Sequence, residues 1–384
     1  MLNVVSIIVR IVSIIISLYM VLSILSGLGA RDKVLQVASS QISRPKISVV
    51  ESADYVIETD GITTYVKNKN GIIVYSSMDS ASAIQYAIDS LPQGKVLVRV
   101  GTYNLSNPIN IQKSNVVVEG ESHATVLRIA RNNSYCIRIG LENSTQKVCE
   151  NVIIRNLTLD GGYPTVDRST GVSVSACDNI LIEYVYFRNC GERNWIASWS
   201  EDEYRKKNVV IRNCVFDGVA VTFGGIDGGI VENNMFIGEM VSPRINTTVD
   251  LSYGEINNSL VTSLLFKNNI FLYSRRNRNI VVTWDGVLVG FQRTRNVIIA
   301  DNIFIEPDGY GIRFRDWVAE GVTLLAEDIH ITRNQINCNN NATYGIYVAF
   351  GDRIIVKDNL VRYATIQNIY ISESVTNVIE RDNM

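Results

Sequence analysis

The sequence predicts an all-β solenoid, a single-stranded right-handed parallel β-helix, on the evidence of two recurring phrases and their spacing. The first phrase, a turn residue followed by two or three apolar residues, occurs nine times between Asn115 and Met384, for example at 151–156 and 296–302. A tenth, degenerate copy lies at 228–234, and with it the copies from Asn151 onward start 20 to 35 residues apart, which is the period of stacked coils. The second phrase, Gly-apolar-any-apolar, precedes most copies, as at 171–174 and 345–348.

Each copy of the first phrase is expected to form a strand. The copies combine β-branched residues with apolar-polar alternation and lack an apolar stripe of helical period. A strand that recurs once per coil lies parallel to its successor, ~4.8 Å above it. Connections between parallel strands of one sheet are almost always right-handed. One coil therefore carries at least two strands, arranged around an interior of Val, Ile, Leu and Phe.

Asparagine recurs at one place in six successive copies. Its positions are Asn234, Asn269, Asn302, Asn334, Asn359 and Asn383. Stacked asparagines satisfy the backbone groups of a turn, and each amide can bond to the next amide in the stack. We interpret this column as structural and exclude it from the candidate binding residues.

The amino-terminal segment is apolar. The first thirty residues contain one charge, Arg10, followed by an uncharged run from Ile11 to Ala30. This run is long enough to anchor the chain in a membrane through residues 4–29, and it also fits a signal peptide cleaved after Gly29. Both alternatives place the remainder outside the cytoplasm. We therefore expect a signal anchor or signal peptide at 1–30, a linker and hairpin at 31–78, and the β-helix at 79–384.

The two ends of the predicted solenoid differ. Strands are expected at 54–58 and 63–67, joined by a turn at Asp60-Gly61, and a helix is expected from Ser80 to Leu91. The apolar face of this helix would cover the first coil, whose strand edges would otherwise be exposed. The last copy, 377–384, has no such covering segment. We expect its edge to be covered by another subunit, which would make a homo-oligomer, or by a different partner.

The composition limits the classes of partner that the chain is expected to bind. The formal net charge of -2 argues against nucleic acid. None of the six cysteines has the CxxC spacing of a zinc site, so no metal site is predicted. Cys136 and Cys149 flank one loop and are the favoured disulfide, with buried free thiols as the alternative. Seven Asn-x-Ser/Thr sequons would accept glycans if the chain is secreted as a glycoprotein.

The stretch 79–127, with Ala83-Ile84, Val96-Leu97-Val98 and Asn115-Val116-Val117-Val118, resembles the opening of pectate-lyase-like right-handed β-helix proteins. The following repeats resemble the body of this superfamily, so the resemblance covers 79–384. It implies the fold, and Ca²⁺ as a cofactor by analogy. It implies no single activity, because the superfamily includes lyases, hydrolases, epimerases, phage tailspikes and non-catalytic surface proteins. Gly-His-Gly and Asp-Asp motifs are absent, so no catalytic residue is transferred.

The Gly-apolar-any-apolar strands predict a binding face. Their apolar residues point inward, so the intervening residues face outward. In chain order these are Ser173, Ser175, Ala220, Thr222, Leu288, Gly290, Arg313, Arg315, Tyr347, Ala349, Tyr370 and Ser372. A further coil at 248–251 would add Asp250 and Ser252, and would place Asp250 two coils, ~10 Å, below Arg313.

Asp250, Arg313 and Asp316 are the candidate catalytic residues of this face. An arginine pair could hold a uronate carboxylate while a carboxylate serves as acid or base. The candidate substrate-binding residues are Arg315, Trp284, Asp285, Tyr347 and Tyr370. The alternatives are a solvated salt-bridge cluster for the charged residues, and subunit contacts or cross-strand packing for the tyrosines. Both histidines, His123 and His330, are interpreted as structural.

Two functional hypotheses follow. In the first, the chain is an extracellular, cell-surface protein that binds polysaccharide on the outward face, with cleavage by a lyase or glycoside hydrolase mechanism left open. In the second, it is a non-catalytic structural or adhesive surface protein that assembles through its C-terminal coil. The first hypothesis is favoured by the resemblance and by the arginine and tyrosine positions.

Overall fold

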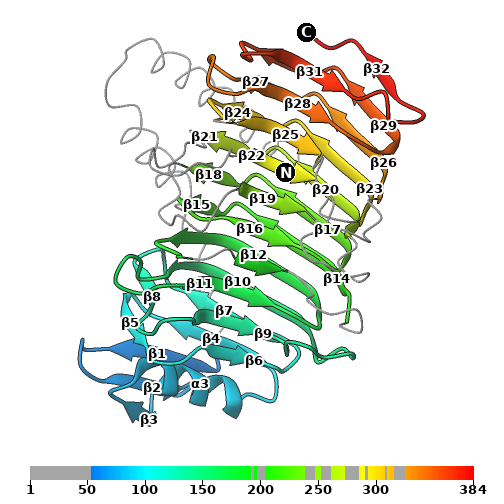
Figure 1. The fold of residues 1–384 in the computed structure, drawn as a ribbon. Helices are drawn as coiled ribbons and strands as arrows, with labels where there is room; N and C mark the ends of the chain where they lie inside the picture. Colours follow the sequence, from blue (N-terminus) through cyan, green and yellow to red (C-terminus); the bar gives the residue numbers. More distant parts are fainter. Residues whose placement is uncertain are drawn as a thin grey trace, which may run out of the picture. The chain divides into compact units, whose positions relative to one another are not determined.

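The computed structural model describes residues 53–191, 194–196, 204–237, 247–251, 261–272, 285–289, 293–307, 309–314 and 325–384. The strands of the compact unit Glu51–Met384 form a parallel β-helix (Figure 1). The predicted signal anchor or signal peptide at 1–30 lies outside the described residues. Within the described ranges, no helix has the length and apolar character needed to cross a bilayer.

The base of the unit is a small antiparallel meander. Strands β1 (Tyr55–Thr59) and β2 (Thr64–Asn68) form the predicted hairpin, and Asp60 Oδ1 accepts hydrogen bonds from the backbone N–H groups of Ile62 and Thr63 at 2.9 and 2.8 Å. Strand β3 (Ile73–Ser77) extends the meander and was not predicted. Strand β1 also pairs in parallel with β4 (Gly94–Val98), which joins the meander to the first coil.

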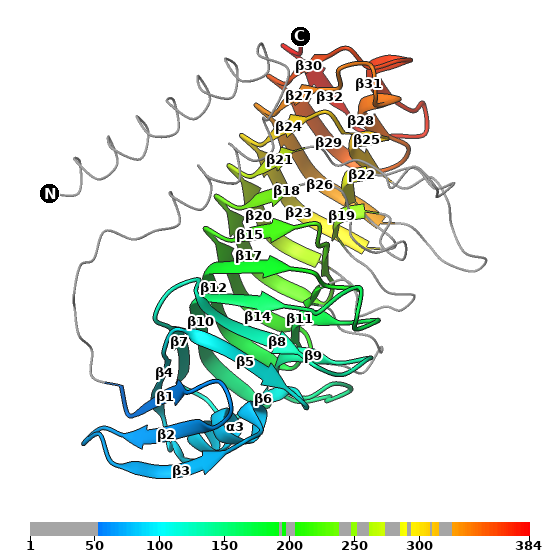
Figure 2. The same ribbon diagram turned by 90° about the vertical axis from the view of Figure 1, so that its left-hand side faces the viewer.

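The predicted helix is confirmed as α3 (Ser80–Ser90), which lies across the base of the stack (Figure 2). Asp79 caps it, because its side chain accepts from the backbone N–H groups of Ala81 and Ser82. Ile84, Ala87, Ile88 and Leu91 are buried in the same core as the coils. The helix therefore covers the core of the first coil, as its apolar period indicated.

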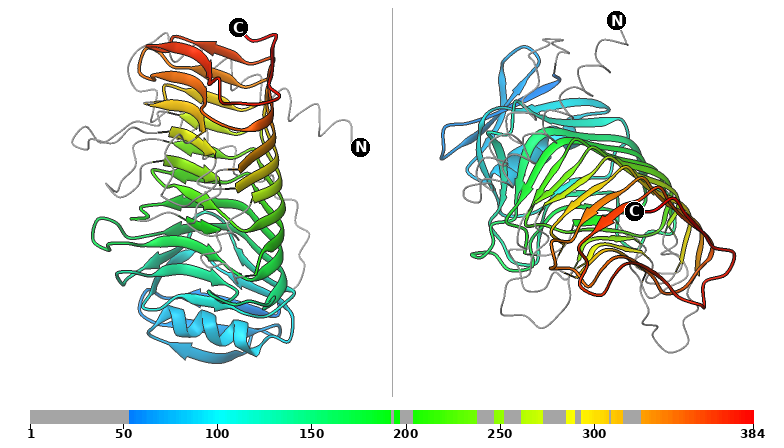
Figure 3. Two further views of the ribbon diagram at one scale, coloured as in Figure 1. Left: turned by 45° about the vertical axis from the view of Figure 1, so that its right-hand side comes forward. Right: turned by 90° about the horizontal axis from the view of Figure 1, so that it is seen from above.

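Each complete coil contributes strands to three parallel ladders, one more than the predicted minimum, and these stack along the axis (Figure 3). The first ladder of sheet A is β4, β7 (Val116–Gly120), β10 (Cys149–Asp160), β12 (Cys177–Arg188), β14 (Lys206–Arg212), β17 (Ile226–Glu232), β20 (Val261–Lys267), β23 (Arg293–Ala300), β26 (Leu325–Thr332), β29 (Asp352–Lys357) and β32 (Ile379–Arg381). The second ladder is β5 (Gly101–Leu105), β8 (Thr125–Ile129), β15 (Val215–Asp217), β18 (Met235–Ile237), β21 (Ile270–Leu272), β24 (Ile303–Ile305), β27 (Gln335–Asn337) and β30 (Leu360–Arg362). Strands β10 and β12 are long enough to belong to both ladders.

Sheet B forms the remaining side of the coil. Its strands are β6 (Ile109–Ile111), β9 (Tyr135–Ile139), β11 (Thr170–Val174), β13 (Asn194–Ile196), β16 (Val221–Phe223), β19 (Thr247–Leu251), β22 (Asp285–Val289), β25 (Tyr310–Phe314), β28 (Tyr344–Val348) and β31 (Gln367–Ile371). Every pairing in this sheet is parallel, and most of the Gly-apolar-any-apolar phrases lie in its strands.

The asparagine column has the predicted structural role at the corner between the two ladders of sheet A. Asn302, for example, is buried, and its side-chain amide donates to Phe266 O at 3.2 Å and to Asn334 Oδ1 at 2.9 Å. Its backbone N–H also donates to Asn334 Oδ1, at 3.1 Å. The residue before it, Asp301, has a φ of 57°, so each corner needs a left-handed residue that the amide stack then secures.

Phenylalanines form a second column inside the coils. Phe187, Phe216, Phe236, Phe271 and Phe304 are stacked with ring centroids 4.4 to 4.8 Å apart. All five rings are at most 2% exposed. Register between parallel strands thus places one aromatic residue of each coil directly over that of the coil before it.

The favoured disulfide is wrong. Cys149 bonds to Cys177, whereas Cys136 is a buried free thiol, as are Cys190, Cys214 and Cys338. Cys149 and Cys177 are register partners on β10 and β12, although 28 residues separate them in the chain. Proximity in a β-helix follows the coil period, so the loop length between Cys136 and Cys149 was a misleading guide.

Candidate functional site

The register of sheet B reproduces the predicted outward column. Asp250 pairs with Leu288, Leu288 with Arg313, Arg313 with Tyr347, and Tyr347 with Tyr370. Asp250 therefore lies two coils below Arg313, as expected. The column also contains Arg138 and Trp195, which pair with Ser173 and which sequence reasoning did not place in it.

Several predicted site residues lie outside the described structure. Trp284, Arg315 and Asp316 are among them. The backbones of Asp250 and Asp285 are placed in β19 and β22, but their side chains are not described. Convergence of Asp250, Arg313 and Asp316 in one cleft consequently stays a prediction.

The outward column is not open along its whole length. Ser173 and Ser175 are each 1% exposed and Thr222 is 0% exposed, which corrects the expectation that all these side chains face solvent. By contrast Arg313, Tyr347 and Tyr370 are partly exposed. The accessible part of the predicted face therefore includes the strands β25, β28 and β31.

Four tyrosines and an arginine gather on these three strands, and we call this group the tyrosine cluster: Tyr310, Arg313, Tyr344, Tyr347 and Tyr370. The rings of Tyr310 and Tyr344 are stacked at 5.7 Å, and those of Tyr347 and Tyr370 at 5.1 Å. The two stacks touch, because the centroids of Tyr344 and Tyr347 are 5.1 Å apart. The guanidinium of Arg313 lies over the Tyr310 ring, 4.5 Å from its centroid.

Glycine explains how Tyr310 and Tyr344 join the cluster. Gly311 and Gly345 follow these tyrosines, and a Cβ at either position would collide with the core side chains of Ile336 or Val361. The strand therefore turns its glycine toward the core, and the preceding tyrosine joins the same face as Arg313. The sequence signal was the recurring Tyr-Gly-Ile at 310–312 and 344–346, of which the glycine and isoleucine were used and the tyrosine was not.

The geometry restricts what the cluster can recognise. A stacked ring has one face covered by its neighbour, which is the cross-strand packing considered above for Tyr347 and Tyr370. Ring edges, the ring faces that no neighbour covers, phenol hydroxyls and one guanidinium are the groups of the cluster that can take part in recognition. Such groups bind hydroxyls and carboxylates. Acid-base chemistry would also need a carboxylate or histidine, and the side chains of Asp250 and of Asp285, the register partner of Tyr310, are outside the described structure.

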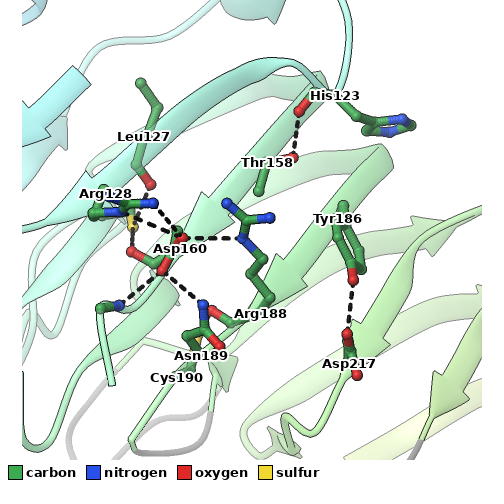
Figure 4. A network of polar contacts seen from close by, with 12 residues as sticks. His123, Leu127, Arg128, Thr158, Asp160, Tyr186, Arg188, Asn189, Cys190 and Asp217 are labelled. Carbon is green, nitrogen blue, oxygen red and sulfur yellow. Dashed lines mark hydrogen bonds and ion pairs between the residues drawn. The ribbon is translucent and has the colours of Figure 1, made fainter. Parts of the chain in front are cut away.

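A separate polar network surrounds Asp160 on the second ladder (Figure 4). Asp160 is 1% exposed and accepts hydrogen bonds from Gly162 N at 2.9 Å, Asn189 Nδ2 at 3.2 Å, and the guanidinium groups of Arg188 and Arg128 at 3.0 and 3.3 Å. Burial alone would raise its pKa, but these donors and charges together lower it. A carboxylate so fully bonded stabilises the corner and has no spare acceptor for a base role.

His123 lies in a turn beside this network. Its Nε2 is 2.8 Å from Tyr184 O, and its carbonyl accepts from Thr158 Oγ1 at 2.7 Å. Burial lowers the pKa of its imidazole, which keeps it neutral. These contacts agree with the structural interpretation. Among the described residues, no three His, Cys, Asp or Glu side chains form a metal-binding group, and Ca²⁺ rests on resemblance alone.

Comparisons with known proteins agree on architecture. No family model and no curated protein sequence matches the chain. Among solved structures, it is similar to an alginate lyase from Paenibacillus sp. str. FPU-7, with a TM-score of 0.52 and 12% identity over 78% of this chain and 96% of that one. A surface adhesin of Streptococcus pneumoniae gives a TM-score of 0.51 and 16% identity over 79% and 89%.

A tailspike protein of E. coli bacteriophage HK620, solved with a pentasaccharide, gives a TM-score of 0.53 and 17% identity over 79% of this chain and 63% of that one. At these identities the likeness concerns the fold. Together with the sheet register, it shows that the chain has the parallel β-helix fold.

Proposed function

We propose that the protein is an extracellular or cell-surface protein that binds an acidic polysaccharide at the tyrosine cluster. The single observation that carries the proposal is the position of Arg313 over the Tyr310 ring, among three further tyrosines of neighbouring coils. A guanidinium held in this way is oriented in advance, so less conformational entropy is lost when it pairs with a carboxylate.

The stacking of the cluster defines the kind of recognition. Because rings of Tyr347 and Tyr370 cover one another, sugar rings would be bound mainly through hydroxyl and carboxylate groups at the phenol edges. Strands rise by ~4.8 Å per coil, so an extended sugar chain along the axis would meet a new coil about every residue. The similar structures include an alginate lyase and a tailspike protein in complex with a pentasaccharide, which supports this class of ligand.

Titration of the purified full chain with a panel of polyuronates and neutral glycans tests the proposal. We expect polyuronates to bind more tightly than neutral glycans of equal length. Arg313→Gln should weaken polyuronate binding about tenfold, since it removes a charge-assisted pair. The matched control is Arg381→Gln on β32, whose side chain is 62% exposed. Absence of binding to every glycan, or equal losses in both variants, would refute the proposal.

Cleavage of the bound polysaccharide is a finer prediction that depends on Asp250 and Asp316. Assays for new reducing or unsaturated ends, with and without Ca²⁺, address it directly. Asp250→Asn should abolish product formation while leaving binding intact if this carboxylate is the acid or base. A wild-type chain that binds and forms no product would remain a polysaccharide-binding protein.

The structural or adhesive alternative is favoured by exposed apolar residues beside β32. Val378 and Ile379 are 40% and 48% exposed. If this coil mediates assembly, deletion of 377–384 should abolish filaments or defined oligomers, as seen by electron microscopy and light scattering. Assembly that survives the deletion would remove this alternative.

A further inference from the structure

The outward side of the first ladder of sheet A carries an unbroken column of aliphatic side chains, which we call the aliphatic stripe. Its register-paired members in seven successive coils are Val117, Ile153, Leu181, Val210, Ile230, Leu265 and Ile298. Each is at least partly exposed, and Ile298 is 39% exposed. The stripe is ~29 Å long at one strand spacing per coil.

The stripe departs from the alternation expected of a solvated face. Strand β7, for example, has apolar residues on its inward and its outward side: Val116 and Val118 lie in the core and Val117 lies outside. The segment 180–182 of β12 has the same pattern. Parallel sheets with apolar residues on both faces are ordinarily covered on both faces. A contiguous exposed apolar patch marks an interaction surface.

A column of charges runs beside the stripe, two residues further along each strand. In chain order it is Glu119, Arg155, Glu183, Arg212, Glu232 and Lys267, so the sign alternates from coil to coil. Neighbours in the column pair with each other, for example Arg155 with Glu119 at 2.8 Å and Lys267 with Glu232 at 3.2 Å.

This alternation is self-complementary in one orientation. Six alternating charges, read in reverse, present the opposite sign at every position. Consider a two-fold axis that runs parallel to the strands and passes between β12 and β14. It places the aliphatic stripe of one copy on that of a second copy, and it places Glu119 opposite Lys267 of the second copy. A two-fold axis along the β-helix would instead oppose the charges to the neutral asparagines Asn115, Asn151, Asn179 and Asn208, which flank the stripe on its other side.

We propose that two copies of the chain pair face to face and antiparallel through the aliphatic stripe. Apolar burial supplies the affinity, and the charge column supplies the orientation. This interface leaves the tyrosine cluster on sheet B uncovered, so the proposal does not depend on polysaccharide binding.

Sedimentation equilibrium of the full chain over a wide concentration range tests the interface. We expect a dimer whose dissociation constant rises at least about a hundredfold in Leu181→Glu, because two charges would be buried at its centre. Ile366→Glu, at a residue that is 67% exposed and outside the stripe, is the matched control and should leave the dimer unchanged. Circular dichroism verifies that both variants fold.

A charge swap tests the orientation without changing the stripe. Glu119→Lys would oppose two lysines and weaken the dimer about tenfold, and adding Lys267→Glu would restore it. Within one chain Glu119 and Lys267 lie coils apart. The swap therefore breaks three intrachain ion pairs, those of Glu119 with Lys95 and Arg155 and that of Lys267 with Glu232, and cannot rescue the stability of the fold. A monomeric wild type, self-association unaffected by Leu181→Glu, or a swap that fails to restore the dimer would overturn the proposal.

Discussion

The buried phenylalanine column and the exposed tyrosine cluster are both products of coil-to-coil register. Inside, Phe236 stacks between Phe216 and Phe271 at 4.8 and 4.6 Å. Outside, Tyr347 stacks on Tyr370 at 5.1 Å. The interior rings exclude water and contribute to stability, whereas the exterior rings stay partly exposed beside Arg313. Aromatic periodicity alone therefore does not distinguish a candidate binding site from core packing, whereas exposure and a neighbouring charge do.

The largest expected effect is on the interior column. Phe236→Ala should lower the free energy of unfolding by about 4 kcal/mol, because it leaves a cavity between two stacked rings. Affinity for polysaccharide, measured well below the unfolding temperature, should not change. Denaturant unfolding and titration of the same sample provide both values. A Phe236→Ala variant that stays folded and no longer binds polysaccharide would contradict the distinction between the phenylalanine column and the tyrosine cluster.

The asparagine stack extends the comparison to polar groups. Asn302→Ala should lower the free energy of unfolding by about 2 kcal/mol, because Phe266 O loses a buried donor and the backbone N–H of Asn269 loses its acceptor, Asn302 Oδ1. A second asparagine stack, exposed and formed by Asn115, Asn151, Asn179 and Asn208, provides the matched control. Asn179→Gly keeps the left-handed backbone there and should lower the free energy of unfolding by less than about 1 kcal/mol. Equal losses of stability in the two variants, measured by thermal unfolding, would mean that burial does not distinguish the two asparagine stacks.

Asp160 adds a pH dependence to the interior. Its lowered pKa means that the folded state favours the ionised form. The contribution of Asp160 to the free energy of unfolding is therefore complete above its ordinary pKa of 3.8 and is lost as the pH falls through the lowered pKa of the folded state. Asp160→Asn should destabilise by about 2 kcal/mol at neutral pH. The gap to wild type should narrow in acid. Unfolding midpoints that run parallel from pH 7 to pH 2.5 would contradict the ionised network.

The smallest effect belongs to the exposed hydroxyls. Tyr370→Phe retains the ring stack and removes one hydrogen-bonding group, so affinity should fall only about threefold to tenfold. Stability should be unchanged. Tyr65→Phe, at the exposed hairpin, serves as the control for loss of a phenol hydroxyl. A larger loss in the control would place recognition elsewhere.

Repeated phrases predicted much of this structure because a solenoid converts sequence period into contact. The cap helix, the hairpin at Asp60, the asparagine stack and the order from Asp250 to Tyr370 all follow from local patterns. Arg138 was missed because β9 lacks the glycine that marked β11, β22, β25 and β28. The Cys149–Cys177 bond was missed because the pairing was judged from loop length, although both cysteines stand two residues before the turn asparagine of their copies, Asn151 and Asn179, and are therefore in register.

The repeat pattern also did not predict which side chains of the outward face are buried. Ser173 and Thr222 occupy the same column as Arg313, and alternation assigns all three to the outside. Which part of a column stays open depends on the segments that pack over it, and the strand repeat carries no information about them. The tyrosine cluster therefore emerged from exposure and ring geometry.

Parallel measurement of glycan affinity and unfolding free energy in Tyr347→Ala tests the central claim most directly. Tyr347 contacts Tyr310, Tyr344 and Tyr370, so its removal dismantles the cluster. We predict at least a tenfold loss of polyuronate affinity with a change in unfolding free energy of about 1 kcal/mol. Unchanged affinity in a folded variant would contradict the assignment of the tyrosine cluster as the binding site.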